Sequence, residues 1–117
     1  MMKNDAWAMG IDLGGTKIEI ARMDREGNLH RSERVPTEAS LGPGGVKERL
    51  AEAIRAFISR AGSPPLGIGI GVAGLVDPGR GSVRLGPNLG GRDISLKEDL
   101  RRAVGLPVFV ANDVRAA

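Results

Sequence analysis

The chain has 117 residues, which allows one domain large enough to bury a hydrophobic core. It contains no cysteine and no apolar run as long as a membrane span, so disulfides, thiolate metal sites and membrane-spanning helices are excluded. The net charge is +3, but the charges alternate in sign and only one Trp and two Phe are present, which argues against nucleic-acid binding. We therefore expect a cytoplasmic protein that binds neither nucleic acid nor membrane.

The first third of the chain predicts three strands joined by short turns, a pattern typical of an antiparallel meander. The strands are expected at residues 7–13, 17–23 and 28–36. Two glycines separate the first pair, and the turn sequence Asp-Arg-Glu-Gly separates the second strand from the third. Leu29 and Val35 are expected to point toward the core from the third strand.

The rest of the chain predicts two helices and three more strands. The helices are expected at 46–61 and 96–104, and the strands at 66–73, 82–85 and 108–111. Loops rich in Gly and Pro cover 37–45 and 86–94, and Ser95 with Glu98 forms a capping box before the second helix. The order βββ-α-β-β-α-β predicts an α/β fold with a mixed sheet flanked by helices.

The segment Asp-Leu-Gly-Gly-Thr-Lys, residues 12–17, has the composition of a phosphate site. Gly14 and Gly15 let backbone N–H groups approach an anion, while Thr16 adds a hydroxyl donor and Lys17 a positive charge. Asp12 ends the first strand and is placed to face Mg²⁺ through a water molecule, with no direct metal ligand expected. The same residues fit a plain hairpin with a Gly-Gly turn, so both interpretations stay open.

Polar residues also follow later strands of the predicted sheet. Asp113 comes after the last strand, where its carboxylate can accept a proton from a substrate hydroxyl. Asn112 beside it can donate and accept hydrogen bonds, which suits a polyol, although both residues would also fit the N-cap of a following helix. Asn88 lies in a Pro-Asn-Leu loop that fits a simple turn as well. Asp12, Gly74 and Asp113 all fall at strand ends, where ligands of such sheets bind.

The segment from Gly69 to Gly74 matches the dinucleotide fingerprint G-x-G-x-x-G, with Asp93 at about the expected distance downstream. That fingerprint must open a helix, and Pro78 with its neighbouring glycines forbids one. We therefore expect glycines that allow close strand packing, not a nicotinamide site. The single histidine, His30, has no set of metal ligands around it and is assigned to the surface.

Four sequence blocks in this order resemble the N-terminal half of the ROK family (repressor, open reading frame, kinase), and in particular its glucokinase-like sugar kinases. The blocks are residues 10–17, 69–77, 87–90 and 105–113, and the match runs from about Met9 to Ala117. The family belongs to the actin-like ATPase superfamily with a ribonuclease-H-like fold. The resemblance implies that residues 1–117 are the N-terminal domain of a sugar kinase and that the C-terminal nucleotide-binding half is absent.

The resemblance also implies roles for individual residues. Residues 12–17 would form the first phosphate loop, and Gly74, Asn88 and Asn112 would line the sugar site. Asp113 would bind the sugar as well and act as the base, taking a proton from a sugar hydroxyl that attacks the γ-phosphate of ATP. ATP and Mg²⁺ are the implied cofactors of the complete enzyme, and any zinc site would lie outside this chain.

The chain departs from the family pattern at two places. Val114 and Arg115 follow Asp113 where the family usually has Ala-Asn, and Gly91-Arg92 stand where sugar kinases often have an aromatic residue. These departures leave the identity of the hexose or amino-hexose open.

We expect a kinase half that is inactive alone and forms a homodimer. One alternative is the sugar-sensing domain of a ROK transcription regulator, although the eight residues before Met9 leave no room for a helix-turn-helix. The other alternative is a non-catalytic sugar-binding or dimerising module.

Overall fold

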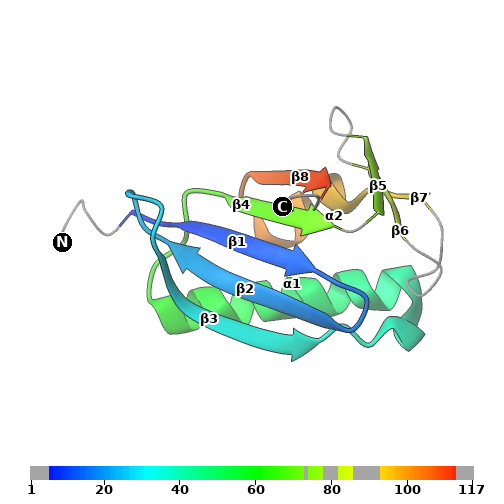
Figure 1. Cartoon of the computed structure of the whole chain (residues 1–117), viewed down its shortest axis with the longest axis horizontal. Helices are drawn as coiled ribbons and strands as arrows, with labels where there is room; N and C mark the ends of the chain where they lie inside the picture. The colour runs from blue at the N-terminus through cyan, green and yellow to red at the C-terminus, as the bar shows by residue number, and fades with distance from the viewer. Residues whose placement is uncertain (1–5, 73, 78–81, 86–92, 113–117) are drawn as a thin grey trace.

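The computed structural model describes residues 6–72, 74–77, 82–85 and 93–112 (Figure 1). The elements in chain order are β1 (Ala8–Leu13), β2 (Lys17–Met23), β3 (Leu29–Pro36), η2 (Ala39–Leu41), α1 (Gly42–Ala61), β4 (Ile68–Val72), β5 (Gly74–Asp77), β6 (Ser82–Leu85), β7 (Asp93–Ile94), α2 (Leu96–Val104) and β8 (Val108–Asn112). Among these residues, no helix is long and apolar enough to cross a membrane.

The main sheet of the described residues has five strands in the order β3-β2-β1-β4-β8. The first three strands form the antiparallel meander that the short turns predict, whereas β1, β4 and β8 run parallel to one another. Parallel neighbours need a crossover connection, and α1 provides it between β3 and β4. Strands β5, β6 and β7 form a separate small antiparallel sheet.

Both helices pack on one face of the main sheet and enclose the core with it (Figure 1). Side chains alternate along a strand, so every second residue of β1, β2, β4 and β8 points to the helices. The buried strand residues are Met9, Ile11, Leu13, Ile18, Ile20, Ile68, Ile70, Val72, Val108 and Val110, and the helices add Val46, Leu50, Ala51, Ile54, Phe57, Leu96 and Leu100. Lys47 of α1 forms an ion pair with Asp99 of α2, and Arg55 donates to the Ala103 carbonyl at 3.1 Å.

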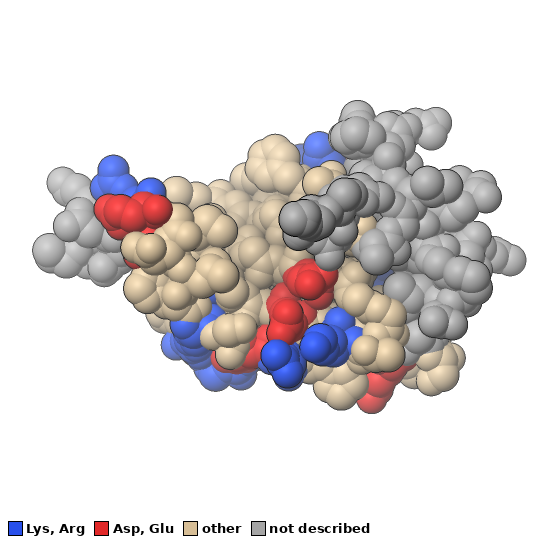
Figure 2. Space-filling view, viewed as in Figure 1, with Lys and Arg blue, Asp and Glu red and all other residues tan. Residues whose placement is uncertain are grey.

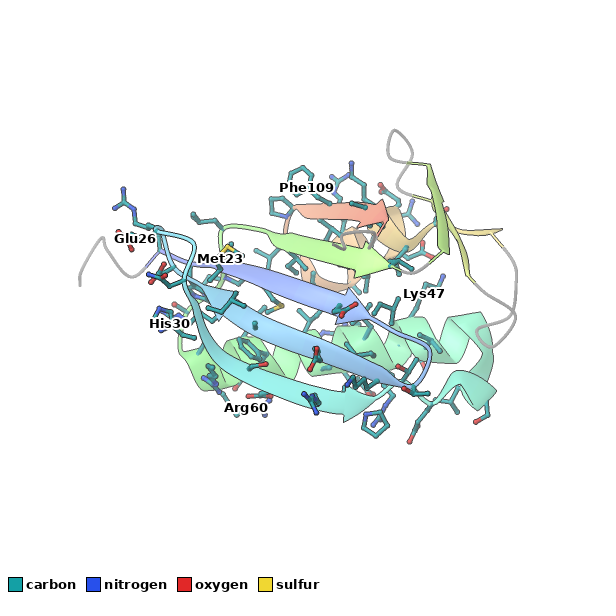
Figure 3. The ribbon with its side chains drawn as sticks, viewed as in Figure 1. Met23, Glu26, His30, Lys47, Arg60 and Phe109 are labelled. Carbon is teal, nitrogen blue, oxygen red and sulfur yellow. The ribbon has the colours of Figure 1, made fainter. Side chains whose placement is uncertain are left out.

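The opposite face of the sheet carries no helix in the described part of the molecule (Figure 1), and small residues line much of it. A Cβ added at Gly10 or Gly69 would meet nothing within 4 Å. Phe109 projects from this face of β8 with 64% of its surface exposed (Figure 3). The two faces of the sheet therefore differ in both cover and residue size.

The sequence-based prediction for the third strand was wrong at Leu29, which is 65% exposed. The register between β2 and β3 shifts at Ala21 and Arg22, where Arg31 has a positive φ of 38°. The extra residue of this bulge reverses which side chains of β3 face the helices. Leu29, the partner of Met23, therefore points away from the core. Val35, beyond the bulge, packs against the core as predicted.

Helix α1 begins earlier than predicted, because residues 39–45 are helical and not loop. Pro43 lies in the first turn, where its missing N–H breaks no helical hydrogen bond. Helix α2 has the predicted bounds, but the capping box is wrong: Ser95 makes no side-chain hydrogen bond to the helix start. Strands β5 and β7 were not predicted, since segments of four and two residues among Gly and Pro show no periodicity.

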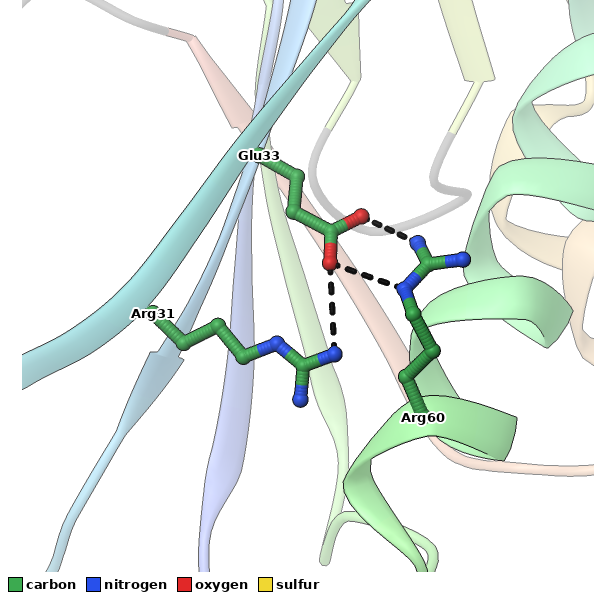
Figure 4. Close-up of polar contacts among 3 residues, drawn as sticks. All are labelled: Arg31, Glu33 and Arg60. Carbon is green, nitrogen blue, oxygen red and sulfur yellow. Dashed lines mark hydrogen bonds and ion pairs between the residues drawn. The ribbon is translucent and has the colours of Figure 1, made fainter.

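A cluster of three charged side chains joins β3 to the end of α1 (Figure 4). Arg60 Nε donates to Glu33 Oε2 at 3.0 Å, its second nitrogen pairs with Oε1, and Arg31 donates to Oε2 at 3.3 Å. The Arg60 guanidinium lowers the pKa of the Glu33 carboxyl, and the pKa of Arg60 rises in return. The Arg31 guanidinium also lies 5.0 Å from the centre of the Phe57 ring, so this cation–π contact joins the bulge in β3 to helix α1.

Candidate active site

The carboxyl ends of β1, β4 and β8 meet in one row of the sheet. Leu13 pairs with Val72, and Val72 pairs with Asn112. Two described segments therefore lie at this edge: the glycine loop that follows β1, and Gly74, which begins β5 shortly after β4. Asp113 is the next residue in the sequence after Asn112, the last residue of β8. This edge is where a parallel strand arrangement places its ligands.

The glycine loop is a tight hairpin between β1 and β2. The Gly14 N–H donates to the Lys17 carbonyl at 3.0 Å, and Gly15, Thr16 and Lys17 are exposed. A Cβ at Gly14 would lie 3.1 Å from the Lys17 oxygen, so close backbone approach favours glycine there. Gly14 and Gly15 do not have the positive φ that favours glycine. In the described residues, the glycines with a positive φ are Gly27, Gly42, Gly62 and Gly105. The hairpin interpretation describes the backbone correctly, and it leaves the loop open to an anion.

Thr37 fixes this loop through two hydrogen bonds, a role that no sequence pattern predicted. The Thr37 side chain is fully buried, and its Oγ1 donates to the Gly14 carbonyl at 2.8 Å. The Thr37 backbone N–H donates to the Thr16 carbonyl at 3.0 Å. The residue after β3 therefore fixes two carbonyls of the loop, those of Gly14 and Thr16. A threonine directly after Pro36 was the only sequence signal, and it does not distinguish this role from a turn.

Asp12 lies on the open face of β1, one residue before the end of the strand. It is exposed and is flanked by Gly71 on β4 and Glu19 on β2. Two carboxylates on adjacent strands repel each other, but Arg34 offsets this because its Nε donates to Glu19 Oε2 at 2.6 Å. Figure 2 shows acidic and basic side chains next to one another on this side of the molecule. An exposed carboxylate at this position has the chemistry to face a hydrated Mg²⁺.

The structure places the remaining predicted residues as follows. Gly74 begins β5 and Asn112 ends β8, both at the carboxyl edge. Asn88 and Asp113 lie outside the described residues. Within the described ranges, no group of three or more His, Cys, Asp or Glu residues is arranged to hold a metal ion.

His30 lies at the far end of the sheet, on the hairpin between β2 and β3 (Figure 3). Its Nε2 is 2.7 Å from Asp24 Oδ2. The His30 hydrogen bond, with backbone N–H donors from Asn28 and Glu26, lowers the pKa of Asp24 to about 2. This polar cluster closes a turn and takes no part in the candidate site.

The sequence profile of the ROK family matches residues 8–117. The chain belongs to the ROK family. It is 39% identical over 109 residues to a glucokinase of Streptomyces coelicolor, an alignment that covers 93% of this chain and 33% of the glucokinase.

Two solved ROK structures are similar to it. A glucokinase from Streptomyces griseus, in complex with glucose and AMPPNP, is 34% identical with a TM-score of 0.82, over 95% of this chain and 34% of its own. A ROK family transcriptional regulator, a homologue of the E. coli MLC protein, is 26% identical with a TM-score of 0.85, over 99% of this chain and 30% of its own.

The chain spans about a third of the length of these relatives. The structural likeness confirms the ribonuclease-H-like α/β fold of actin-like ATPases. The predicted order βββ-α-β-β-α-β lacked only the short elements β5, β7 and η2. The G-x-G-x-x-G match runs from β4 into β5 and opens no helix, as predicted.

Proposed function

We propose that this chain supplies the first phosphate loop and the sugar-facing edge of an ATP-dependent kinase for a hexose or amino-hexose. The observation that carries the proposal is the single row formed by Leu13, Val72 and Asn112, because it brings the glycine loop and Asn112 to one edge, and Asp113 is the residue that follows Asn112 in the sequence. The glucokinase relative and the glucose and AMPPNP complex of the Streptomyces griseus enzyme support this substrate class.

The proposed step transfers the γ-phosphoryl group of ATP to a sugar hydroxyl. The Asp113 carboxylate takes the hydroxyl proton, the sugar oxygen forms a bond to phosphorus, and ADP leaves. Residues 12–17 bind the phosphates through backbone N–H groups, the Thr16 hydroxyl and the Lys17 ammonium, while Gly74, Asn88 and Asn112 bind the sugar. When bound, Mg²⁺ supplies charge neutralisation at the phosphates, with Asp12 as its water-mediated partner. Positioning of the two substrates provides most of the acceleration.

We further propose that the chain alone has little or no kinase activity, that it forms a homodimer, and that it acts in the cytoplasm. The first point rests on length, since the chain matches a third of the glucokinase. Turnover of glucose by the chain alone at about 1–100 s⁻¹, the range of complete kinases, would contradict it. Sedimentation equilibrium at micromolar concentration tests the dimer, and a strictly monomeric species would exclude it.

The similarity to the transcriptional regulator favours a second proposed function, in which the chain senses a sugar without phosphoryl transfer. Isothermal titration with glucose, with and without ATP, distinguishes the two within a full-length protein that contains this chain. A kinase converts bound glucose to its phosphate when ATP is added, whereas a sensor binds glucose and leaves it unchanged.

The decisive experiment is Asp113→Asn in that full-length protein. General-base catalysis contributes roughly 10²–10⁴-fold, so kcat should fall by about this factor while the Kd for sugar changes little. Asp24→Asn, the same change at the far end of the sheet, is the control and should leave kcat unaltered. An unchanged kcat in Asp113→Asn would remove this residue from the mechanism.

A further inference from the structure

A groove of about 550 Å³ lies between α2 and the edge strand β8. Three cations and one carboxylate line it together with an exposed aromatic ring; these residues are Lys97, Arg101, Arg102, Glu98 and Phe109. Its volume is that of a ligand site, yet none of the residues assigned to phosphoryl transfer contributes to it. The groove is therefore a second surface of the domain.

The floor of this surface includes an unpaired sheet edge. In the described part of the chain, β8 pairs only with β4 and ends the sheet. The Ile68 N–H donates to the Pro107 carbonyl at 2.9 Å, and this parallel ladder turns the backbone groups of Phe109 toward β4. By alternation, the N–H and C=O groups of Val108 and Val110 point away from the sheet. The edge can therefore accept another strand.

The charge of the groove is positive. Glu98 pairs with Arg101 at 3.2 Å and with Arg102 at 3.6 Å, so one carboxylate serves two guanidinium groups. Lys97 has no carboxylate partner among the described residues. Two positive charges therefore remain uncompensated beside the free edge.

Lys97 reaches around the edge of β8. Helix α2 packs on the covered face of the sheet, whereas the Phe109 ring lies on the open face. The Lys97 ammonium is nevertheless 5.8 Å from the centre of that ring. A lysine in this position protects an edge strand from indiscriminate pairing, and a carboxylate from an incoming strand would give it a stronger partner than the ring.

We propose that this groove binds an acidic, extended peptide segment as an added strand along β8. Alternate residues of the segment place carboxylates beside Lys97 and Arg101, and the residues between them contact Phe109 on the open face. Main-chain hydrogen bonds to Val108 and Val110 provide affinity, and the cations select acidic sequences. This binding activity does not depend on the proposed kinase function.

Fluorescence anisotropy with a labelled, end-blocked heptapeptide of alternating Glu and Val tests the proposal on the 117-residue chain. We expect saturable binding that weakens with salt. Lys97→Glu should weaken binding about tenfold, whereas Arg25→Glu, the same charge reversal in the exposed β2–β3 turn, should leave it unchanged. Equal binding of the matching Lys-Val peptide would overturn the selection for acidic sequences.

Amide hydrogen exchange distinguishes strand addition from simple charge attraction. Bound peptide should newly protect the Val108 and Val110 amides, while the Phe109 amide, already directed at β4, should change little. A peptide of the same sequence with every backbone amide N-methylated keeps its charges but cannot donate to the edge in either strand direction, and it should not bind. Equal binding of the N-methylated peptide, or binding without new protection, would overturn the proposal. If no peptide bound and the Lys97→Gln variant self-associated through β8, Lys97 would serve only to prevent edge-to-edge pairing, and the proposal would be overturned.

Discussion

The two faces of the main sheet use the same strands for different purposes. On the covered face, large apolar side chains from β1, β2, β4 and β8 interlock with α1 and α2, and they are almost completely buried. On the open face, the same strands present small or charged residues such as Gly10, Asp12 and Gly69. The covered face therefore provides most of the folding stability, and residues on the open face are available for ligand binding.

The energetic difference between the faces follows from residue size. Burial of a large apolar side chain contributes about 1.5–3 kcal/mol, and the covered face contains many of them. Small residues expose little apolar surface to water, so leaving this face uncovered costs little free energy of folding. Asp12 and the glycine loop lie where this open face meets the carboxyl edge, which gives them a rigid support without burial.

The sharpest test of the comparison pairs two phenylalanines. Phe57 on α1 is fully buried, packs 5.8 Å from the Trp7 ring and lies beneath Arg31, so Phe57→Ala should cost about 3–5 kcal/mol. Phe109→Ala removes the same atoms from the open face and should change stability by about 0.5 kcal/mol or less. Urea unfolding of both variants measures the difference. Similar losses would mean that the open face is packed in solution.

The sequence was informative where side-chain periodicity was undisturbed. Apolar runs on either side of the glycine turn predicted β1 and β2. The pair Ser95 and Glu98 with Gly105 predicted both ends of α2, although Ser95 makes no capping hydrogen bond. Prediction failed where local chemistry competes with periodicity. Pro43 looks like a loop residue but opens a helix, and the bulge near Arg31 reverses the direction of Leu29. Neither effect can be seen from propensity alone, because tertiary contacts decide it.

Thr37→Val tests the contact that supports the glycine loop between β1 and β2. Valine has nearly the same shape as threonine but cannot donate to the Gly14 carbonyl, so the cost should be about 1–3 kcal/mol. Thermal unfolding measures the loss, and faster amide exchange at Gly14 reports loosening of the loop. Thr37→Ser keeps the hydroxyl and is the control. A Val variant as stable as the unmodified chain would show that this hydrogen bond does not hold the loop.

Candidate site residues were predictable to the extent that they lie at strand ends. The loop over 12–17 follows an apolar run, and register places it beside Gly74 and Asn112 as expected of parallel strands. Thr37 was not predictable, because its role depends on the pairing of β2 with β3, which brings a residue 23 positions away beneath Gly14. Long-range contacts of this kind leave no local pattern.

A smaller effect is expected from a methyl group added to the open face. Gly69 has no neighbour within 4 Å of an added Cβ, so Gly69→Ala should be neutral or stabilise the fold by up to about 1 kcal/mol. Gly14→Ala is the matched change at a crowded position, since its Cβ would lie 3.1 Å from the Lys17 carbonyl. Thermal unfolding should therefore rank Gly14→Ala below Gly69→Ala. The reverse order would show that the face around Gly69 is covered.

The smallest effect concerns the exposed hairpin at the far end of the sheet. The His30 hydrogen bond and backbone N–H donors lower the Asp24 pKa from 3.8 to about 2, so the ionised form is favoured in the folded chain. The resulting stabilisation is complete above the unfolded pKa of 3.8 and disappears as pH falls through about 2. Because the group is exposed, solvent screens this contribution and it should be slight. Carboxyl chemical shifts in an NMR titration give the pKa directly, and His30→Ala should raise it toward 3.8. An unchanged Asp24 pKa in that variant would assign the shift to the turn backbone, with Asn28 and Glu26 as its donors.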